Sequence, residues 1–172
     1  PAPPAGLDAG LISDFEEGTS GSRFGSGWQE STDSVMGGKS TVQLEIAAAG
    51  AQGSRHSLSL SGQVAAGGAI AWSGAVWFPA NKPFAPADLS AKKAITFRAR
   101  GDGQAYQVLF YFRKGGFMPA WQTFVAGPEW KEFTFDFTRF SGLDCGEITA
   151  VAFSAGPKPG PFCFQLDDIE LQ

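Results

Sequence analysis

Short stretches of alternating apolar and polar residues recur along this 172-residue chain, and glycine or proline separates most of them. Val42, Leu44 and Ile46, for example, alternate with polar neighbours across residues 41–47. A period of two is typical of a strand with one buried face, whereas an amphipathic helix repeats at roughly 3.6 residues. Because no longer window holds a helical period, the pattern predicts an all-β protein.

The pattern predicts strands at residues 11–17, 41–47, 56–61, 69–78, 95–100, 106–113, 117–125, 130–137, 148–155 and 162–171. The last two are expected to form a hairpin over 156–160, and Trp28–Ser40 is interpreted as a loop leading into strand 41–47. The content of 16 Phe, 5 Trp, 23 Gly and 11 Pro suits many strands joined by turns. The predicted fold is an antiparallel β-sandwich of the jelly-roll, galactose-binding-domain-like type.

The first residues are rich in proline and alanine, and the chain does not begin with Met. Residues 1–10 are therefore expected to be a linker or the remnant of a leader, followed by one sandwich domain at 11–172. Such a start favours an exported bacterial protein, periplasmic or extracellular, over a mitochondrial one. We expect a monomer or a part of a larger chain.

The charge pattern excludes several classes of partner. Thirteen basic and 17 acidic residues give a net charge of −4, and the chain has no run of Lys or Arg. Nucleic acid and anionic membrane surfaces are therefore poor partners. No apolar stretch approaches the roughly 20 residues that span a bilayer, so membrane insertion is not expected.

The sequence carries no recognisable catalytic motif. The one histidine, His56, falls on the polar face of a predicted strand and is interpreted as a surface residue. With one His and only Cys145 and Cys163, a zinc site would need carboxylates. The two thiols are predicted to be buried and free, with a disulfide as the alternative. A hydrolase acting through a pair of carboxylates is a further alternative. Its two acids would have to lie about 5–10 Å apart.

Acidic residues near the two ends of the domain suggest a structural calcium site. Asp14 and Glu16 belong to the first predicted strand and Asp167 to the last. Terminal strands of a sandwich often lie side by side, and calcium prefers oxygen ligands gathered from separate segments. Exposed charge on edge strands is the other interpretation, and the sequence does not separate the two.

Aromatic residues with polar neighbours suggest a ligand site, because a sugar ring packs its C–H face on an aromatic ring while polar groups fix its orientation. Most rings in such a chain belong to the core, but Tyr111 lies off the apolar face of its strand. The candidate ligand-binding residues are Tyr111, Trp121, Phe117, Arg98, Arg100, Arg113 and Gln107.

Four segments together resemble the complex I intermediate-associated protein 30 family. They are Trp28 with Asp33–Ser40, Asp88–Ser90 with Arg100–Tyr106, Trp130 with Phe133–Phe140, and Gly160–Phe162 with Asp167–Leu171. The resemblance implies a galactose-binding-like jelly roll that is similar to carbohydrate-binding modules and has no catalytic residues. Mitochondrial members assist assembly of respiratory complex I. The similar carbohydrate-binding modules hold a structural calcium near the start and end of the fold.

These observations predict a non-catalytic module that binds a glycan through exposed aromatic residues. A protein-interaction or assembly factor with the same fold is the first alternative, and the hydrolase is the second.

Overall fold

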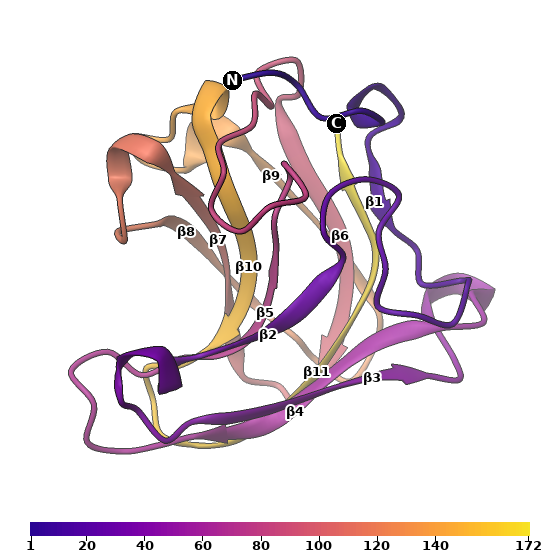
Figure 1. Cartoon of the computed structure of the whole chain (residues 1–172). Coiled ribbons are helices and arrows are strands. Elements are labelled where there is room, and N and C mark those ends of the chain that lie inside the picture. The colour runs from indigo at the N-terminus through magenta and orange to yellow at the C-terminus, as the bar shows by residue number, and fades with distance from the viewer.

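The computed structural model describes all 172 residues and contains eleven strands in two facing sheets (Figure 1). The strands are β1 (Leu11–Ser13), β2 (Trp28–Thr32), β3 (Thr41–Ala47), β4 (Ser57–Val64), β5 (Ser73–Trp77), β6 (Ala94–Gly101), β7 (Ala105–Phe112), β8 (Ala120–Val125), β9 (Lys131–Asp136), β10 (Ile148–Ala155) and β11 (Gly160–Leu171). The only helices are short 3-10 turns, and none is long and apolar enough to cross a membrane. The expectation of an all-β jelly-roll sandwich is confirmed.

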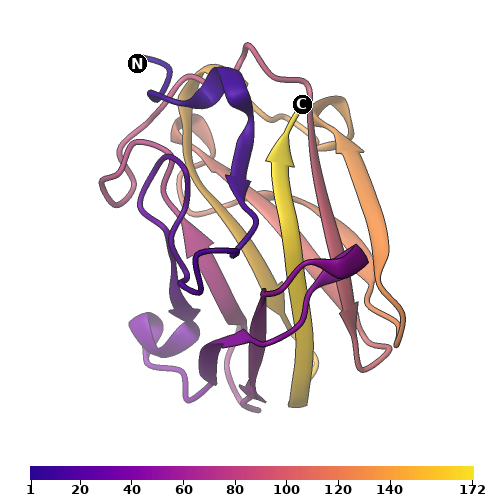
Figure 2. The same cartoon turned by 90° about the vertical axis from the view of Figure 1, so that its right-hand side faces the viewer.

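One sheet has the strand order β3-β4-β11-β6-β9, with β1 added beside β11, and is called the β11 sheet below. The other has the order β2-β5-β10-β7-β8 and is called the β10 sheet. All pairings are antiparallel. Figure 2 shows β1 next to β11, so the first and last strands do lie side by side, and both chain ends lie at the same end of the sandwich.

The core lies between the sheets and is built largely of aromatic rings. Phe97 of the β11 sheet contacts Phe153 of the β10 sheet edge to face, with ring centroids 4.9 Å apart, and Phe124 packs on both. Such edge-to-face pairs add to the free energy gained from burying apolar area. The alternation of the sequence is thus explained, because the inward positions of both sheets pack together in this core.

Two local predictions are wrong, and the residues predicted to be a linker or leader remnant contact the domain. Residues 28–32 form an edge strand, β2, rather than part of a loop. The two C-terminal strands do not form a hairpin, because β10 and β11 belong to different sheets and the 156–160 turn arches between them. Residues 1–10 are not a free linker, since Leu7 is buried in the core and Asp88 N–H donates to the Ala2 carbonyl.

The outer face of the β10 sheet carries a second, smaller apolar cluster, separate from the main core. Its members are Val76, Phe78, Leu109, Ala150 and Ala152, with Tyr111 packed against them. Figure 1 shows that β10 bends, and the outer side of its sheet lies on the inside of that bend. This curved face is where the candidate site is found.

Candidate binding face

Two rows of side chains cross the outer face of the β10 sheet, each taking one residue from every strand. The apolar row consists, in register, of Trp121, Leu109, Ala152, Val76 and Gln29. The polar row beside it consists of Thr123, Gln107, Ser154, Gly74 and Ser31. Because neighbouring strands lie about 4.8 Å apart, each row is roughly 20 Å long, which is longer than a single sugar ring.

Aromatic residues flank the two rows. The Trp121 side chain at one end of the apolar row is 50% exposed, so a flat ring is open to a ligand. Tyr111 lies one step along β7 from the rows, and burial raises the pKa of its hydroxyl. Trp72 directly precedes β5, and its indole N–H donates to Ser31 Oγ at 3.3 Å. The middle of the two rows is largely buried, since Leu109 and Val76 are each 8% exposed and Ser154 is 4% exposed. Their ends combine the exposed Trp121 ring with the hydroxyl and amide groups of Thr123, Gln107, Gln29 and Ser31.

The most exposed apolar side chains of the protein lie on β8 and in the connections between strands. The eight large hydrophobic side chains that are most exposed are Val35, Met36, Ile70, Phe84, Phe117, Met118, Trp121 and Val125. All of them lie on β8 or in segments that directly precede or follow β2, β5 or β8. The outer face of the β11 sheet presents polar side chains instead, such as Gln43, Ser59 and Arg98. Of the eight exposed apolar side chains, only Trp121 and Val125 lie on a strand, and both point to the outer face of the β10 sheet.

The structure divides the predicted ligand-binding residues into three groups. Tyr111, Trp121 and Gln107 lie together on the outer face of the β10 sheet. Phe117, which is 92% exposed, and Arg113 lie in the connection between β7 and β8, beyond one end of that face. Arg113 is paired with Glu147 at 3.2 Å.

Arg98 and Arg100 are a correction, because β6 belongs to the β11 sheet and they point away from this face. Arg98 forms ion pairs with Glu132 at 3.2 Å and with Asp168 at 3.6 Å. Arg100 lies over the Trp130 ring, 5.1 Å from its centroid, and donates to Gln165. Both guanidinium groups are therefore engaged within the protein.

Sequence reasoning did not select Leu109, Val76, Trp72 or the small hydroxyl residues of the polar row. Leu109 and Val76 sit in largely apolar strands that are buried on both faces. Alternation therefore gives no sign of which side chains point away from the main core. Trp72 could have been found from the sequence. It lies an odd number of residues from the core residue Trp77 in residues 69–78, so the two side chains point to opposite faces.

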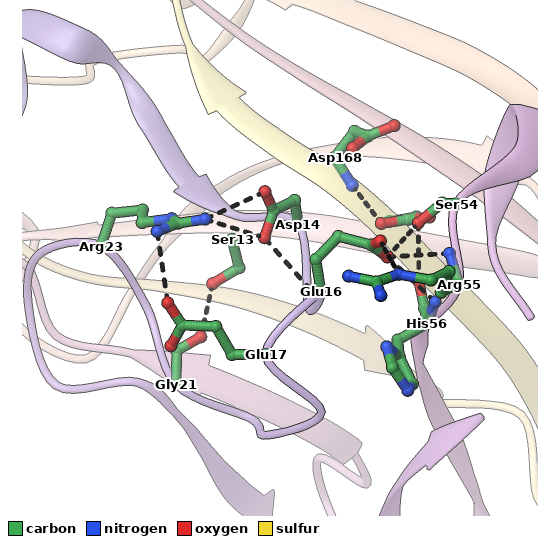
Figure 3. A network of polar contacts seen from close by, with 11 residues as sticks. Ser13, Asp14, Glu16, Glu17, Gly21, Arg23, Ser54, Arg55, His56 and Asp168 are labelled. Atoms are coloured by element: carbon green, nitrogen blue, oxygen red, sulfur yellow. Dashed lines mark hydrogen bonds and ion pairs between the residues drawn. The ribbon is translucent and has the colours of Figure 1, made fainter. Parts of the chain in front are cut away.

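The three predicted calcium ligands do not form one group. Asp14 is paired with Arg23 at 3.2 Å, whereas Glu16 turns the other way (Figure 3). Glu16 accepts from Ser54 Oγ at 2.6 Å and from the backbone N–H groups of Arg55 and His56, and these donors lower its pKa to about 2, with Ser54 as the main cause. No cluster of three or more His, Cys, Asp or Glu side chains is arranged to hold a metal ion.

Asp167 has no exposed surface, and it lies on the other side of Ser54 from Glu16. Its carboxylate accepts from the backbone N–H groups of Ala51 and Asp168, at 2.9 and 2.8 Å. Burial raises its pKa to about 6. Glu16 and Asp167 thus share the donor Ser54, and calcium binding stays a prediction. Because Asp167 is closed to solvent, it cannot touch a substrate as the acid of a hydrolase.

The remaining reactive side chains are isolated. Cys145 is half-buried and Cys163 is exposed. Both thiols are free, which agrees with the prediction, but neither is fully buried, which does not. His56 is half-buried rather than a surface residue, and its Nδ1 atom is buried without a hydrogen-bond partner. Ser54 and Glu16 contact the His56 backbone, but no hydrogen bond joins either of them to its imidazole.

Solved structures of carbohydrate-binding modules share this fold. A family 11 module from Clostridium thermocellum, in complex with a β-1,3-1,4-mixed-linked tetrasaccharide, is 20% identical, with a TM-score of 0.67 and 94% of each chain covered. A family 30 module from the same organism is 16% identical, with a TM-score of 0.58, over 78% of this chain and 90% of that one. An exo-β-agarase is 13% identical, with a TM-score of 0.69, over 95% of this chain but only 24% of its own.

At these identities the structural similarity establishes the fold. A search of curated protein sequences gives no significant match. The family model of complex I intermediate-associated protein 30 matches residues 14–158, which is most of the chain. The protein therefore belongs to the complex I intermediate-associated protein 30 family.

Proposed function

We propose that this protein is a non-catalytic module that binds a glycan chain on the outer face of the β10 sheet. The observation that carries the proposal is the apolar row, ending in the half-exposed Trp121, beside a parallel row of hydroxyl and amide groups. No other face of the sandwich combines these two features.

The chemistry of a sugar chain suits such a surface. The C–H groups of a pyranose ring gain contact with an aromatic or aliphatic floor, and the hydroxyl groups need donors and acceptors at the side. Gln107 and Gln29 supply both kinds of group, and the accessible Thr123 and Ser31 supply hydroxyls. A floor made of strands is rigid, so a ligand that fits it does not have to order the protein.

The comparisons support this proposal by analogy only. A family 11 module holds a tetrasaccharide, and a family 29 module has been solved with mannohexaose. Both share the sandwich with this chain, at 20% and 10% identity. Neither defines the sugar that this protein would bind.

Calorimetry with a panel of soluble polysaccharides tests the proposal. Trp121→Ala should weaken the affinity for any bound glycan about tenfold or more, since an aromatic anchor contributes over 1 kcal/mol. Gln107→Ala should weaken it as well. The matched control is Trp130→Ala, which removes an indole from the outer face of the other sheet. Equal losses with Trp121→Ala and Trp130→Ala, or no binding of any glycan, would refute the proposal.

A second candidate function is protein interaction or assembly, which the exposed apolar loops favour. Phe117 and Met118 are 92% and 67% exposed beyond one end of the face, and Val35 and Met36 are 82% and 73% exposed beside β2. A polar glycan gains little from such side chains. If Phe117→Ser with Met118→Ser abolishes capture of a protein partner while Trp121→Ala does not, this second function is favoured.

A further inference from the structure

The strand orders of the two sheets end in four edge strands, β2, β3, β8 and β9. An edge strand offers unpaired backbone N–H and C=O groups, and proteins that stay monomeric usually protect such edges with charged side chains. Glu30 lies on β2 and Glu45 on β3, and β9 carries Lys131, Glu132 and Asp136. Three of the four edges are therefore protected.

The edge strand β8 has no such protection. The whole stretch from Gly115 to Pro128 contains no charged residue. Within it, β8 has the sequence AWQTFV and pairs only with β7. At alternate residues of β8, the backbone N–H and C=O groups thus point away from β7, its one neighbour. An uncharged six-residue strand of high β-propensity at an open edge is a ready template for another strand.

The side chains on the exposed face of β8 are apolar as well. Trp121 is 50% exposed and Val125 is 56% exposed, and Thr123 lies between them. All three point to the outer face of the β10 sheet. A strand that pairs with β8 could therefore cover them as well as the backbone.

We propose that a second copy of this chain pairs antiparallel with β8, so that two β10 sheets join into one continuous sheet. Self-pairing suits β8 because two identical uncharged strands bring no like charges together. If the two-fold axis passes through Thr123, Trp121 of each copy lies opposite Val125 of the other. Such aromatic and β-branched cross-strand pairs are favourable. This arrangement departs from the monomer that the sequence suggested.

The area available indicates a weak dimer. Trp121 and Val125, together with the neighbouring Phe117 and Met118, would bury on the order of 1,000 Å² over both copies. Stable complexes bury about 1,600 Å², so this interface belongs to the weak, concentration-dependent class. The dimer would also place two candidate binding faces edge to edge, but the pairing itself depends only on β8.

Sedimentation velocity at protein concentrations from roughly 1 µM to roughly 1 mM, without added glycan, tests the proposal. The unmodified protein should shift toward the dimer as concentration rises. Val125→Lys adds a charge to the open edge and should leave a monomer over the whole range with an unchanged melting temperature. Thr41→Lys, which places the same charge at an exposed position of the edge strand β3, should dimerise like the unmodified protein. A protein that stays monomeric throughout, or a Val125→Lys variant that still dimerises, would overturn the proposal.

A crosslinking measurement tests the register. In a background with Cys145→Ser and Cys163→Ser, Thr123→Cys places two cysteines opposite each other across the two-fold axis. Facing positions on antiparallel strands have Cβ atoms about 4.5–5.5 Å apart, close enough for a disulfide after small adjustment. Thr123→Cys should form a covalent dimer on mild oxidation much faster than Thr41→Cys in the same background. Equal rates for the two variants would show that β8 is not the contact.

Discussion

Asp33→Ala is predicted to destabilise the fold strongly. Asp33 lies in one of the segments that carry the family resemblance, and its role there is structural. Asp33 begins the 3-10 turn after β2, and its side chain is only 2% exposed. It accepts from the Ser40 backbone N–H at 3.0 Å and from the Ser40 hydroxyl at 2.7 Å. Ser40 Oγ accepts in turn from the Ala65 N–H at 2.9 Å. The carboxylate therefore ties together the ends of β2, β3 and β4.

The magnitude follows from the two donors that would be left behind. Ser40 is 5% exposed, so water cannot readily replace the lost acceptor. An unsatisfied buried donor costs about 1–3 kcal/mol, and alanine also avoids the cost of burying a charge, so a net loss of about 3 kcal/mol is expected. Against a typical total of roughly 5–15 kcal/mol, this is a large fraction of the stability.

Urea unfolding followed by tryptophan fluorescence measures this loss. Glu30→Ala is the matched control, because Glu30 is an exposed acid close by on β2 and should change stability by no more than about 0.5 kcal/mol. Ser40→Ala and the double variant complete a thermodynamic cycle, in which the two losses should be far from additive. If Asp33→Ala costs no more than Glu30→Ala, or if the losses add, the hydrogen-bond network does not hold this region and the argument fails.

Three further predictions concern the fold. In EDTA, the unfolding free energy should rise by about 1.3 kcal/mol as the pH falls from roughly 7 to roughly 5. The reason is that the pKa of Asp167 is raised to about 6, so the folded state binds a proton in this range that the unfolded state does not. Asp167→Asn should remove this slope in urea titrations. Calcium should raise the melting temperature and EDTA should lower it, with Glu16→Gln insensitive to both; identical melts of the unmodified protein in calcium and EDTA would exclude the site. Tyr106→Phe should cost about 1–3 kcal/mol in urea unfolding, since the Tyr106 hydroxyl donates to Asp102 at 2.7 Å; an unchanged midpoint would contradict this.

The alternation of the sequence was sufficient wherever one face of a strand is buried and the other is open. Residues 41–47, for example, were predicted with the bounds that β3 has. Residues 148–155 were also predicted with the bounds of β10, although all eight residues of that strand are buried. β2 was missed because Trp28 is its only buried residue, so an edge strand with two open faces shows no period. The hairpin of β10 and β11 was wrong because local sequence does not say whether a turn joins neighbours in one sheet or arches to the other.

The same limit explains the candidate site. Tyr111 was correctly separated from the apolar face of β7, because parity along one strand is a local property. Arg98 and Arg100 have the same outward parity on β6, but the outward side of β6 belongs to the other sheet. Assigning residues to a common face needs the strand order, which depends on contacts between distant segments. Sequence could therefore predict which side chains point outward but not which of them share a surface.

The segments that carry the family resemblance are mostly structural in this protein. Asp33 is buried against Ser40, and Asp102 accepts from Tyr106 and from the Cys163 N–H, which fixes the turn between β6 and β7 to the start of β11. The two rows of the candidate binding face lie almost wholly outside those segments. Trp121 and Gln107, the residues proposed to meet a ligand, lie on β8 and β7 outside those segments. Family membership therefore defines the sandwich and its turns, whereas the ligand must be read from the outer face of the β10 sheet.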